Sequence, residues 1–325
     1  MNAVATHKPQ TFKWLLKREF WENRGGFVWA PVITGAIATF FAIMAAIIAT
    51  LIGHKHSGDW RTDADDLAEA TRIAGHVGDG ALLGGIGLAL AVLAFVVFFY
   101  ALGSLYDDRR DRSILFWKSL PVSDSQMVLS KLAWTLLLAP LLALGIGVLT
   151  GLAFWIVSAL TTAANGLPGA SGILTHSHPL RIIGNVLLAF PVQILWSLPT
   201  VGWLMLCSAW ARRFPFLWSV LLPFLFCAMA GVVTLVFKIA VDIELPYTSL
   251  LYVVLYRGLA SIVPGAWLPV RGDTQMWNGH DLSGALNLGE SWRMLGHADI
   301  WIGVIVGIAM IWLAIRMRRW RELAD

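Results

Sequence analysis

Two His-x-His pairs are the residues of this chain best suited to hold a metal ion. His54 pairs with His56 and His176 pairs with His178, each in a polar stretch between apolar runs. Imidazole is a common ligand of divalent transition metals, so the two pairs could supply four ligands if their loops met. Solvated loop histidines are the commoner alternative. We therefore treat these four residues as weak candidate metal ligands, and solvated loop histidines are the alternative.

Motifs for nucleotide binding and hydrolysis are missing from the sequence. It contains no G-x-x-x-x-G-K-[ST] phosphate-binding loop, no H-E-x-x-H and no G-x-S-x-G. Cys207 and Cys227 both lie in apolar stretches, where thiols behave as small hydrophobic groups. We therefore expect a chain that is not an enzyme, has no catalytic residues and holds no cofactor of its own.

The most specific pattern of polar residues runs from Tyr106 to Lys131. Its charged first part should form a short helix over Asp107–Lys118, and Pro121 should end it because the proline ring removes a backbone donor. Ser123 and Gln126 form an S-x-x-Q capping box that should start the next helix. The expected product is a helix–break–helix elbow. Its candidate functional residues are Asp107, Asp108, Arg109, Arg112, Ile114, Phe116, Trp117, Leu120, Pro121, Ser123, Gln126 and Lys131.

The apolar segments that connect these residues must lie in a lipid bilayer. Of the 325 residues, 58% are hydrophobic and 14% are charged, and the mean hydropathy is +0.70. Soluble domains are about 25% charged. One globular core cannot bury so much apolar surface, and backbone in lipid must satisfy its hydrogen bonds internally. The composition therefore predicts an all-α polytopic membrane protein.

Six apolar runs reach the length of about 20 residues that crosses the hydrocarbon core of a bilayer. They define a transmembrane domain over residues 27–316, which an N-terminal arm (1–26) and a basic tail (317–325) flank. The outer loops should be 53–80, 161–181 and 242–298, and the elbow lies in loop 106–131. The six runs are Phe27–Ile52, Ala81–Leu105, Leu132–Leu160, Ile182–Trp210, Phe216–Val241 and Asp299–Arg316.

The distribution of basic residues predicts the orientation. Sixteen of the 24 Lys and Arg residues lie in the arm, the elbow loop, the turn after the fourth run and the tail. Cytoplasmic loops are enriched in Lys and Arg. Both termini and the elbow should therefore be cytoplasmic, in a bacterial-type inner (plasma) membrane.

A helix at Thr11–Arg24 should lie along the membrane surface before the first span. Its apolar and aromatic side chains cover part of its circumference, and lysines and an arginine cover an adjacent part. The residues assigned to this interfacial helix are Phe12, Trp14, Leu15, Leu16, Phe20 and Trp21.

Few polar residues fall within the apolar runs. Tyr247–Val263 is only 17 residues long and carries Arg257 at its centre, so we expect a re-entrant outer segment rather than a seventh span. A cation at membrane depth is costly unless it is paired, which makes Arg257 a candidate for contact with an anionic group or an acidic neighbour. Asn185 and Gln193 are the other candidate substrate or gate residues.

The elbow resembles the loop between the second and third helices of type-2 ATP-binding-cassette (ABC-2) exporter permeases. The residues that carry the resemblance are Ser113-Ile114, Leu120-Pro121-Val122-Ser123 and Ser130-Lys131. The family often has Gly where Arg112 stands here. The layout of six helices, cytoplasmic termini, an N-terminal interfacial helix and short re-entrant helices before the last span is also similar.

The resemblance implies the permease subunit of an exporter. Such a chain forms a translocation path as a homo- or heterodimer, and two copies of a separate ATPase subunit, which bind Mg-ATP, act on a coupling helix in the elbow. Membrane lipids would be further partners, and nucleic acid would not. The alternatives are a stand-alone secondary transporter and a membrane scaffold or immunity protein without ATP coupling. The sequence places no Asp or Glu deep in a span, which disfavours ion-coupled transport.

Overall fold

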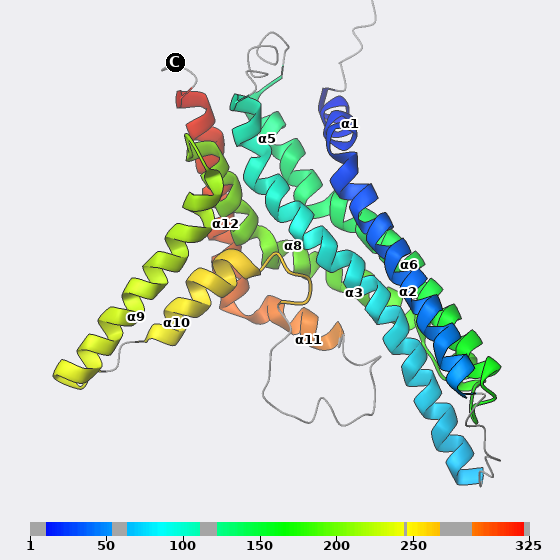
Figure 1. Cartoon of the computed structure of the whole chain (residues 1–325). Helices are drawn as coiled ribbons and strands as arrows, with labels where there is room; N and C mark the ends of the chain where they lie inside the picture. The colour runs from blue at the N-terminus through cyan, green and yellow to red at the C-terminus, as the bar shows by residue number, and fades with distance from the viewer. Residues whose placement is uncertain (1–10, 54–63, 111–121, 244–245, 267–287, 322–325) are drawn as a thin grey trace, which may run out of the picture.

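The computed structural model describes residues 11–53, 64–110, 122–243, 246–266 and 288–321, and every regular element within them is helical (Figure 1). Among these described residues, six helices are long and apolar enough to span a membrane, which is consistent with the predicted polytopic class. The elements are α1 (Thr11–Arg24), η1 (Gly25–Trp29), α2 (Ala30–Gly53), α3 (Ala64–Arg110), α5 (Asp124–Ala133), η2 (Trp134–Leu138), α6 (Ala139–Ala164), α7 (Gly172–Thr175), α8 (Pro179–Trp210), η3 (Leu217–Leu221), α9 (Leu222–Val241), α10 (Tyr247–Leu251), η4 (Tyr252–Ala260), α11 (Leu288–Arg293), η7 (Met294–Gly296) and α12 (Ala298–Arg321).

The second spanning helix is much longer than its apolar run. Helix α3 has 47 residues and takes in the second half of the segment expected as outer loop 53–80. At 1.5 Å per residue it is about 70 Å long, more than twice the hydrocarbon thickness. Its charged ends must therefore project beyond the apolar core of a bilayer.

Three π-helical segments let long helices pass a proline without breaking. Pro31, Pro140 and Pro223 each lie two residues after the end of such a segment, η1, η2 and η3 respectively. The residue before each proline donates its backbone N–H to the carbonyl five residues back rather than four. The wider turn keeps the helix hydrogen-bonded where the proline ring would collide with the preceding turn.

As a result, α1, η1 and α2 form one continuous helix, and so do α5, η2 and α6. The helix predicted at Thr11–Arg24 is therefore present, and it runs directly into the first spanning helix. Near Pro223, the carbonyl of Ser219 accepts a hydrogen bond from the Trp203 indole at 2.9 Å. Pro223 has no backbone N–H to donate to this carbonyl, so a side chain of the neighbouring helix α8 supplies the hydrogen bond instead. Backbone groups in lipid require such partners.

Small residues bring the spanning helices together. A Cβ added to Gly85 of α3 would lie 2.4 Å from the backbone of Gly151 on α6, and one added to Gly202 of α8 would lie 2.7 Å from the carbonyl oxygen of Gly307 on α12. In lipid, helices associate through such close packing because the solvent is as apolar as the side chains. These two contacts join α3 to α6 and α8 to α12.

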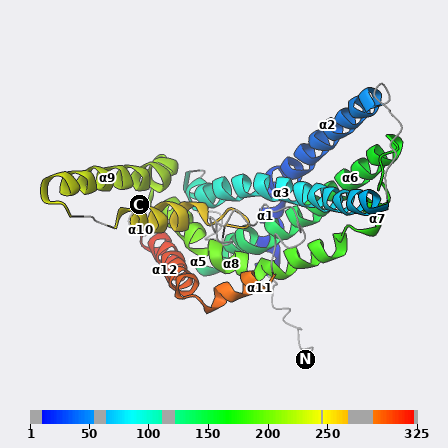
Figure 2. The same ribbon diagram turned by 90° about the horizontal axis from the view of Figure 1, so that it is seen from below.

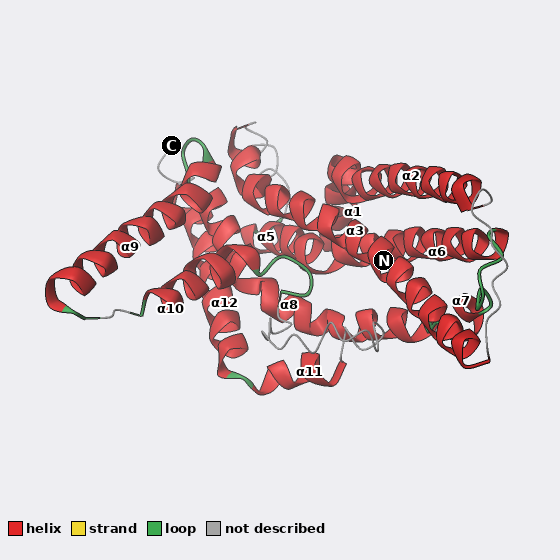
Figure 3. Cartoon of the chain, turned by 60° about the horizontal axis from the view of Figure 1, so that its bottom comes forward, coloured by secondary structure: helices red, strands yellow, loops and turns green. Residues whose placement is uncertain are grey.

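The helices divide into two arms that diverge toward one end. Helices α2, α3 and α6 form one arm, α9 and α10 splay out as the other, and α8 and α12 lie between them (Figures 1 and 2). Helix α1, the end of α3, the start of α5 and the end of α12 all lie at the narrow end (Figures 1 and 3). The pair α10–η4 rises from the lower end of α9 and turns back in the middle of the molecule (Figure 1).

The glycine contact between α3 and α6 predicts a strong effect of one methyl group. A Cβ at Gly151 would lie 2.5 Å from the carbonyl oxygen of Leu82, so Gly151→Ala should lower the free energy of unfolding by about 1–3 kcal/mol. Gly145→Ala on the same helix is the control, because nothing lies within 4 Å of its added Cβ. Thermal unfolding in detergent measures both variants. Equal midpoints for the two variants would refute this packing.

Candidate functional site: a buried charge cluster beside an apolar cavity

The capping box predicted in the elbow is present. The Ser123 hydroxyl accepts a hydrogen bond from the backbone N–H of Gln126, and the Gln126 side-chain oxygen accepts one from the backbone N–H of Ser123. This reciprocal pair starts α5 at Asp124. The N-terminal part of the predicted elbow helix, Asp107–Arg110, is the last turn of α3. The remaining elbow residues, Arg112, Ile114, Phe116, Trp117, Leu120 and Pro121, lie outside the described residues.

Two charged elbow residues, Asp108 and Lys131, meet in the protein interior. The Lys131 ammonium lies 3.4 Å from an Asp108 carboxylate oxygen and 3.1 Å from an oxygen of Glu19 on α1. Arg318 of α12 approaches the other oxygen of Asp108 at 3.4 Å. We call Glu19, Asp108, Lys131 and Arg318 the charge cluster. Each of the four is 7% exposed or less.

Polar neighbours complete this cluster. The Tyr100 hydroxyl donates to the second oxygen of Glu19 at 2.7 Å, and Arg18 lies 3.9 Å from Asp108. Arg318 also lies 3.7 Å from the carboxylate of Asp124 and contacts the Met127 sulfur. The four members balance two positive against two negative charges. Burial of ions is favourable only with such pairing and hydrogen bonding.

The charge cluster joins helices that are far apart in sequence. Its members come from α1, α3, α5 and α12. Arg109, next to Asp108, reaches α8 instead and donates to the carbonyls of Ser208 at 2.5 Å and Ala211 at 3.0 Å. Both ends of the elbow are thereby fixed to the rest of the bundle. Asp107 faces outward, with Arg110 3.9 Å away.

Sequence reasoning missed Glu19 and Arg318, half of the cluster. Glu19 lies four residues after Leu15, so it shares the helix face that carries the apolar residues assigned to the interfacial helix. A carboxylate on an apolar face was the available signal. Arg318 was counted only as one of the basic residues of the C-terminal region, because nothing local distinguishes it from its neighbours.

Helix α1 packs against the start of the third span. Leu15 is buried, Leu16 and Phe20 are half-buried, and Phe12, Trp14 and Trp21 are exposed. The Trp134 indole donates to the Leu16 carbonyl at 2.8 Å, and the Trp134 ring stacks on Phe27 with ring centres 5.2 Å apart. The inward face of α1 therefore holds the helix beside Lys131.

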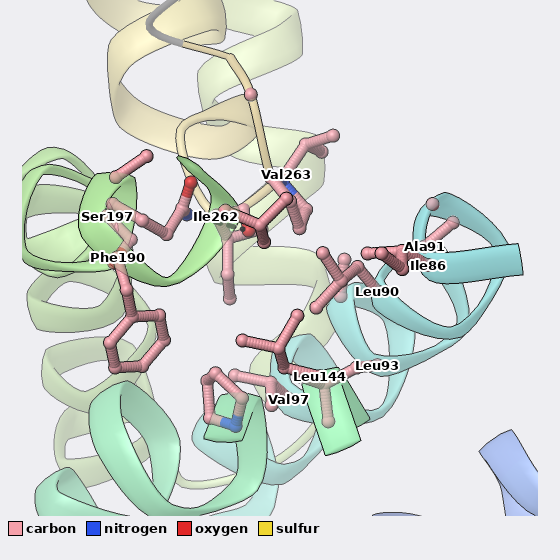
Figure 4. Close-up of a pocket in the computed structure, with 18 of the residues that line it drawn as sticks. Ile86, Leu90, Ala91, Leu93, Val97, Leu144, Phe190, Ser197, Ile262 and Val263 are labelled. Carbon is pink, nitrogen blue, oxygen red and sulfur yellow. Dashed lines mark hydrogen bonds between the residues drawn. The ribbon is translucent and has the colours of Figure 1, made fainter. Parts of the chain in front are cut away.

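An apolar cavity of about 300 Å³ lies among α3, α6 and α8 (Figure 4). Ile86, Leu90 and Val97 line it from α3, and Phe190 and Ser197 from α8 (Figure 4). Further walls come from η2, α6 and the turn at residues 262–265. Thr135 joins the two features, because its side chain lines the cavity and donates to the Lys131 carbonyl at 2.8 Å.

The three polar residues proposed as substrate or gate positions have different surroundings. Gln193 lines the apolar cavity, whereas Asn185 is half-buried on α8 outside its lining. The Arg257 guanidinium lies 3.7 Å from the centre of the Trp196 ring and donates to the carbonyls of Trp196 at 2.9 Å and Asp299 at 3.1 Å. Carbonyl oxygens and a ring face thus compensate this buried cation. Asp299, the acidic neighbour of Arg257, thus contacts it through the backbone carbonyl. The Asp299 carboxylate instead accepts a hydrogen bond from the Tyr252 hydroxyl at 3.4 Å.

Only two of the four candidate metal ligands, His176 and His178, lie among the described residues. His54 and His56 lie outside the described residues, and His176 and His178 are exposed. His178 lies 3.6 Å from the buried carboxylate of Asp79, which also accepts its backbone N–H. Within the described ranges, no three His, Cys, Asp or Glu residues form a group that could hold a metal.

The charge cluster predicts a large effect of neutralising one member. Lys131→Met leaves Glu19 and Asp108 with less compensation, so the free energy of unfolding should fall by about 3–5 kcal/mol. Lys13→Met on the exposed face of α1 should change it by less than about 0.5 kcal/mol. Adding Glu19→Gln to Lys131→Met should restore part of the loss, with a coupling of about 0.5–3 kcal/mol. Chemical unfolding in detergent of the wild type, these three variants and Glu19→Gln alone gives the free energies and the coupling. A Lys131→Met variant as stable as Lys13→Met would contradict the cluster's role.

Comparison with known proteins adds no identification. No protein-family model, no curated protein and no solved structure matches this chain.

Proposed function

We propose that this chain is the membrane-spanning permease subunit of an ABC-2 type exporter. In this proposal it forms the translocation path with a second permease chain, in the inner membrane with both termini cytoplasmic. Two copies of a separate ATPase subunit, which bind Mg-ATP, act on the elbow between α3 and α5. The permease itself catalyses no reaction.

The observation that carries the proposal is that both helices flanking the elbow enter one buried charge cluster. Asp108 ends α3 and Lys131 belongs to α5, and they lie 3.4 Å apart. A force on the elbow would therefore reach α1 through Glu19 and α12 through Arg318. Rigid-body tilting of packed helices is an established way to convert such a force into a change of access.

The helices on both sides of the elbow also line the apolar cavity. Helix α3 lines the cavity with eight residues, from Leu83 to Val97, and continues to Asp108. Helix α5 continues without a break through η2, where Thr135 and Leu136 line the same cavity. The two helices that leave the elbow are therefore the ones that form one side of the cavity.

The buried carboxylates bear on the secondary-transporter alternative. Glu19 and Asp108 are buried, and each lies within 3.4 Å of a cationic side chain. A carboxylate that carries a coupling ion must bind and release that ion during the cycle, whereas the partners of Glu19 and Asp108 are cationic side chains of the same chain. Their pairing favours a structural role over ion coupling.

A crosslinking experiment tests the partner. We expect a photo-crosslinking amino acid at Phe116, in the elbow, to capture a polypeptide with the G-x-x-x-x-G-K-[ST] motif in cells that express the whole system. Leu174, which is 65% exposed in α7 beside the start of α3, is the control position and should not capture it. The purified complex should hydrolyse Mg-ATP and the isolated chain should not. Uptake or efflux by the isolated chain in liposomes, driven by an ion gradient alone, would support the secondary transporter instead.

A labelling experiment tests the orientation on which the proposal depends. Both native cysteines are buried, 2% exposed each, so a membrane-impermeant maleimide should leave the unmodified chain unlabelled. Ser113→Cys in the elbow should react only when the reagent reaches the cytoplasmic face. Ser171→Cys, exposed beside α7, should react only from the outside. The reverse pattern would remove the elbow from the reach of a cytoplasmic ATPase.

A further inference from the structure

A second cavity lies between α8, α9, η4 and α12. Its volume is about 360 Å³, and it shares no lining residue with the apolar cavity. Pro199 lines it from α8, Phe226 from α9, Arg257 from η4 and Val306 from α12. We call this cavity the Arg257 groove. All of its lining residues except Arg257 and Asp299 are uncharged.

Helix α12 gives the groove a polar end and an apolar end. The α12 residues that line it are spaced three or four positions apart and therefore share one face of the helix. They are Asp299, Ile302, Gly303, Val306 and Met310. At 1.5 Å per residue this stripe is about 16 Å long. Asp299 is its only polar member, so the stripe suits a ligand with one polar end and a hydrocarbon chain.

The Arg257 guanidinium lies at the polar end of the groove. Its Nη2 donates to the Asp299 carbonyl at 3.1 Å, and a Cβ added to Gly303 would collide with the same nitrogen. Both Asp299 and Gly303 line the groove. Because Gly303 has no side chain, the guanidinium itself forms the wall at this point.

This cation has no anionic partner within the described ranges. Its two hydrogen bonds go to backbone carbonyls, and no carboxylate of those ranges lies within 4 Å of it. Carbonyl dipoles and the Trp196 ring stabilise the cation but carry no formal negative charge. A guanidinium has five N–H donors, so three of them remain without an acceptor among the described residues.

Burial makes the missing anion significant. Arg257 is only 7% exposed, and a buried charge is costly until an opposite charge pairs with it. Asp299 does not supply that charge, because its exposed carboxylate accepts from the Tyr252 hydroxyl instead. An anionic group that entered the groove would meet a desolvated cation with donors to spare.

We propose that the Arg257 groove binds a single-chain amphiphile with a carboxylate headgroup, such as a fatty acid. The carboxylate pairs with the Arg257 guanidinium, whose planar fork suits carboxylate oxygens. The hydrocarbon extends along α12 from Gly303 toward Met310. A volume of about 360 Å³ is at the small end for ligand pockets, which favours one chain over two. This inference goes beyond the proposed function, because binding requires neither an ATPase nor a second permease chain.

Two positions on α12 provide a matched pair of variants. Val306 lines the groove and is 40% exposed, so Val306→Trp should place a large ring in the groove without disturbing the core. Ile308 is 56% exposed and does not line the groove, so Ile308→Trp adds the same side chain outside it. Thermal unfolding in detergent shows whether each variant folds.

The first experiment measures labelling of the purified full-length chain in non-ionic detergent by a twelve-carbon fatty acid with a photoreactive diazirine. We expect saturable labelling of the wild type at groove residues, reduced at least tenfold in Val306→Trp and unchanged in Ile308→Trp. Labelling of Val306→Trp at the wild-type level would overturn the site.

Competition by unlabelled compounds at pH 8 tests the chemistry of the ligand. Dodecanoate should compete at least tenfold better than dodecanol, which is neutral, and better still than dodecylamine, which is cationic. Phosphatidylglycerol, an anionic lipid with two chains, should compete less well than dodecanoate. Equal competition by acid and alcohol, or stronger competition by the amine or the two-chain lipid, would refute the proposal.

Two charge variants test the role of Arg257. Arg257→Met should remove the preference for dodecanoate over dodecanol, and survival of that preference would contradict the pairing. Asp299→Asn should improve competition by dodecanoate at least twofold, because it removes a negative charge from the polar end; weaker competition would count against the proposal. Asp299 is exposed, so this variant tests the charge even if Arg257→Met does not fold. Because the assay uses the chain alone, its result is separate from that of the crosslinking to an ATPase.

Discussion

The structure depends on the rule that an ion cannot be left alone in a low-dielectric interior. Lys131 is buried between Glu19 and Asp108, and Asp108 in turn faces Arg318. None of these charges would be tolerated there without the others. The cluster therefore fixes where four helices meet, and one of them, α12, comes from the far end of the chain. The elbow is the connection between two cluster helices, so it cannot move without moving them.

A second constraint, on the backbone, extends this arrangement into the bilayer. In lipid every N–H and C=O must find a partner, and prolines within helices threaten that requirement. The π-helical segment η2 resolves it before Pro140, where the Ala139 N–H bonds to the Trp134 carbonyl. The helix that carries Lys131 can then continue as a spanning helix. Without that wider turn, Lys131 would lie on a separate element from Pro140 and Leu144, which line the cavity.

Local features of the structure were predictable and long-range ones were not. The six spans follow from the length of the apolar runs, and the helix start at Asp124 follows from Ser123 and Gln126 alone. Both depend on residues close together in sequence. The partnership of Glu19 with Lys131 joins positions 112 residues apart, and that of Asp108 with Arg318 joins positions 210 apart. Nothing in a single sequence selects those pairs. The cavity was not predictable either, since it is a space among helices whose packing depends on contacts such as Gly85 with Gly151.

The cluster and the cavity share a boundary, and this has a thermodynamic consequence. Thr135 lines the cavity and bonds to the backbone of Lys131, while α3 supplies both Asp108 and the largest part of the cavity wall. A tilt of α3 against η2 would change the width of the cavity, because residues of both line it. By linkage, a ligand that bound one width more tightly would shift the equilibrium of that tilt by the same free energy with which the tilt shifts binding of the ligand. Because none of the residues around the cavity is charged, an uncharged ligand would leave the charge balance of the cluster unchanged.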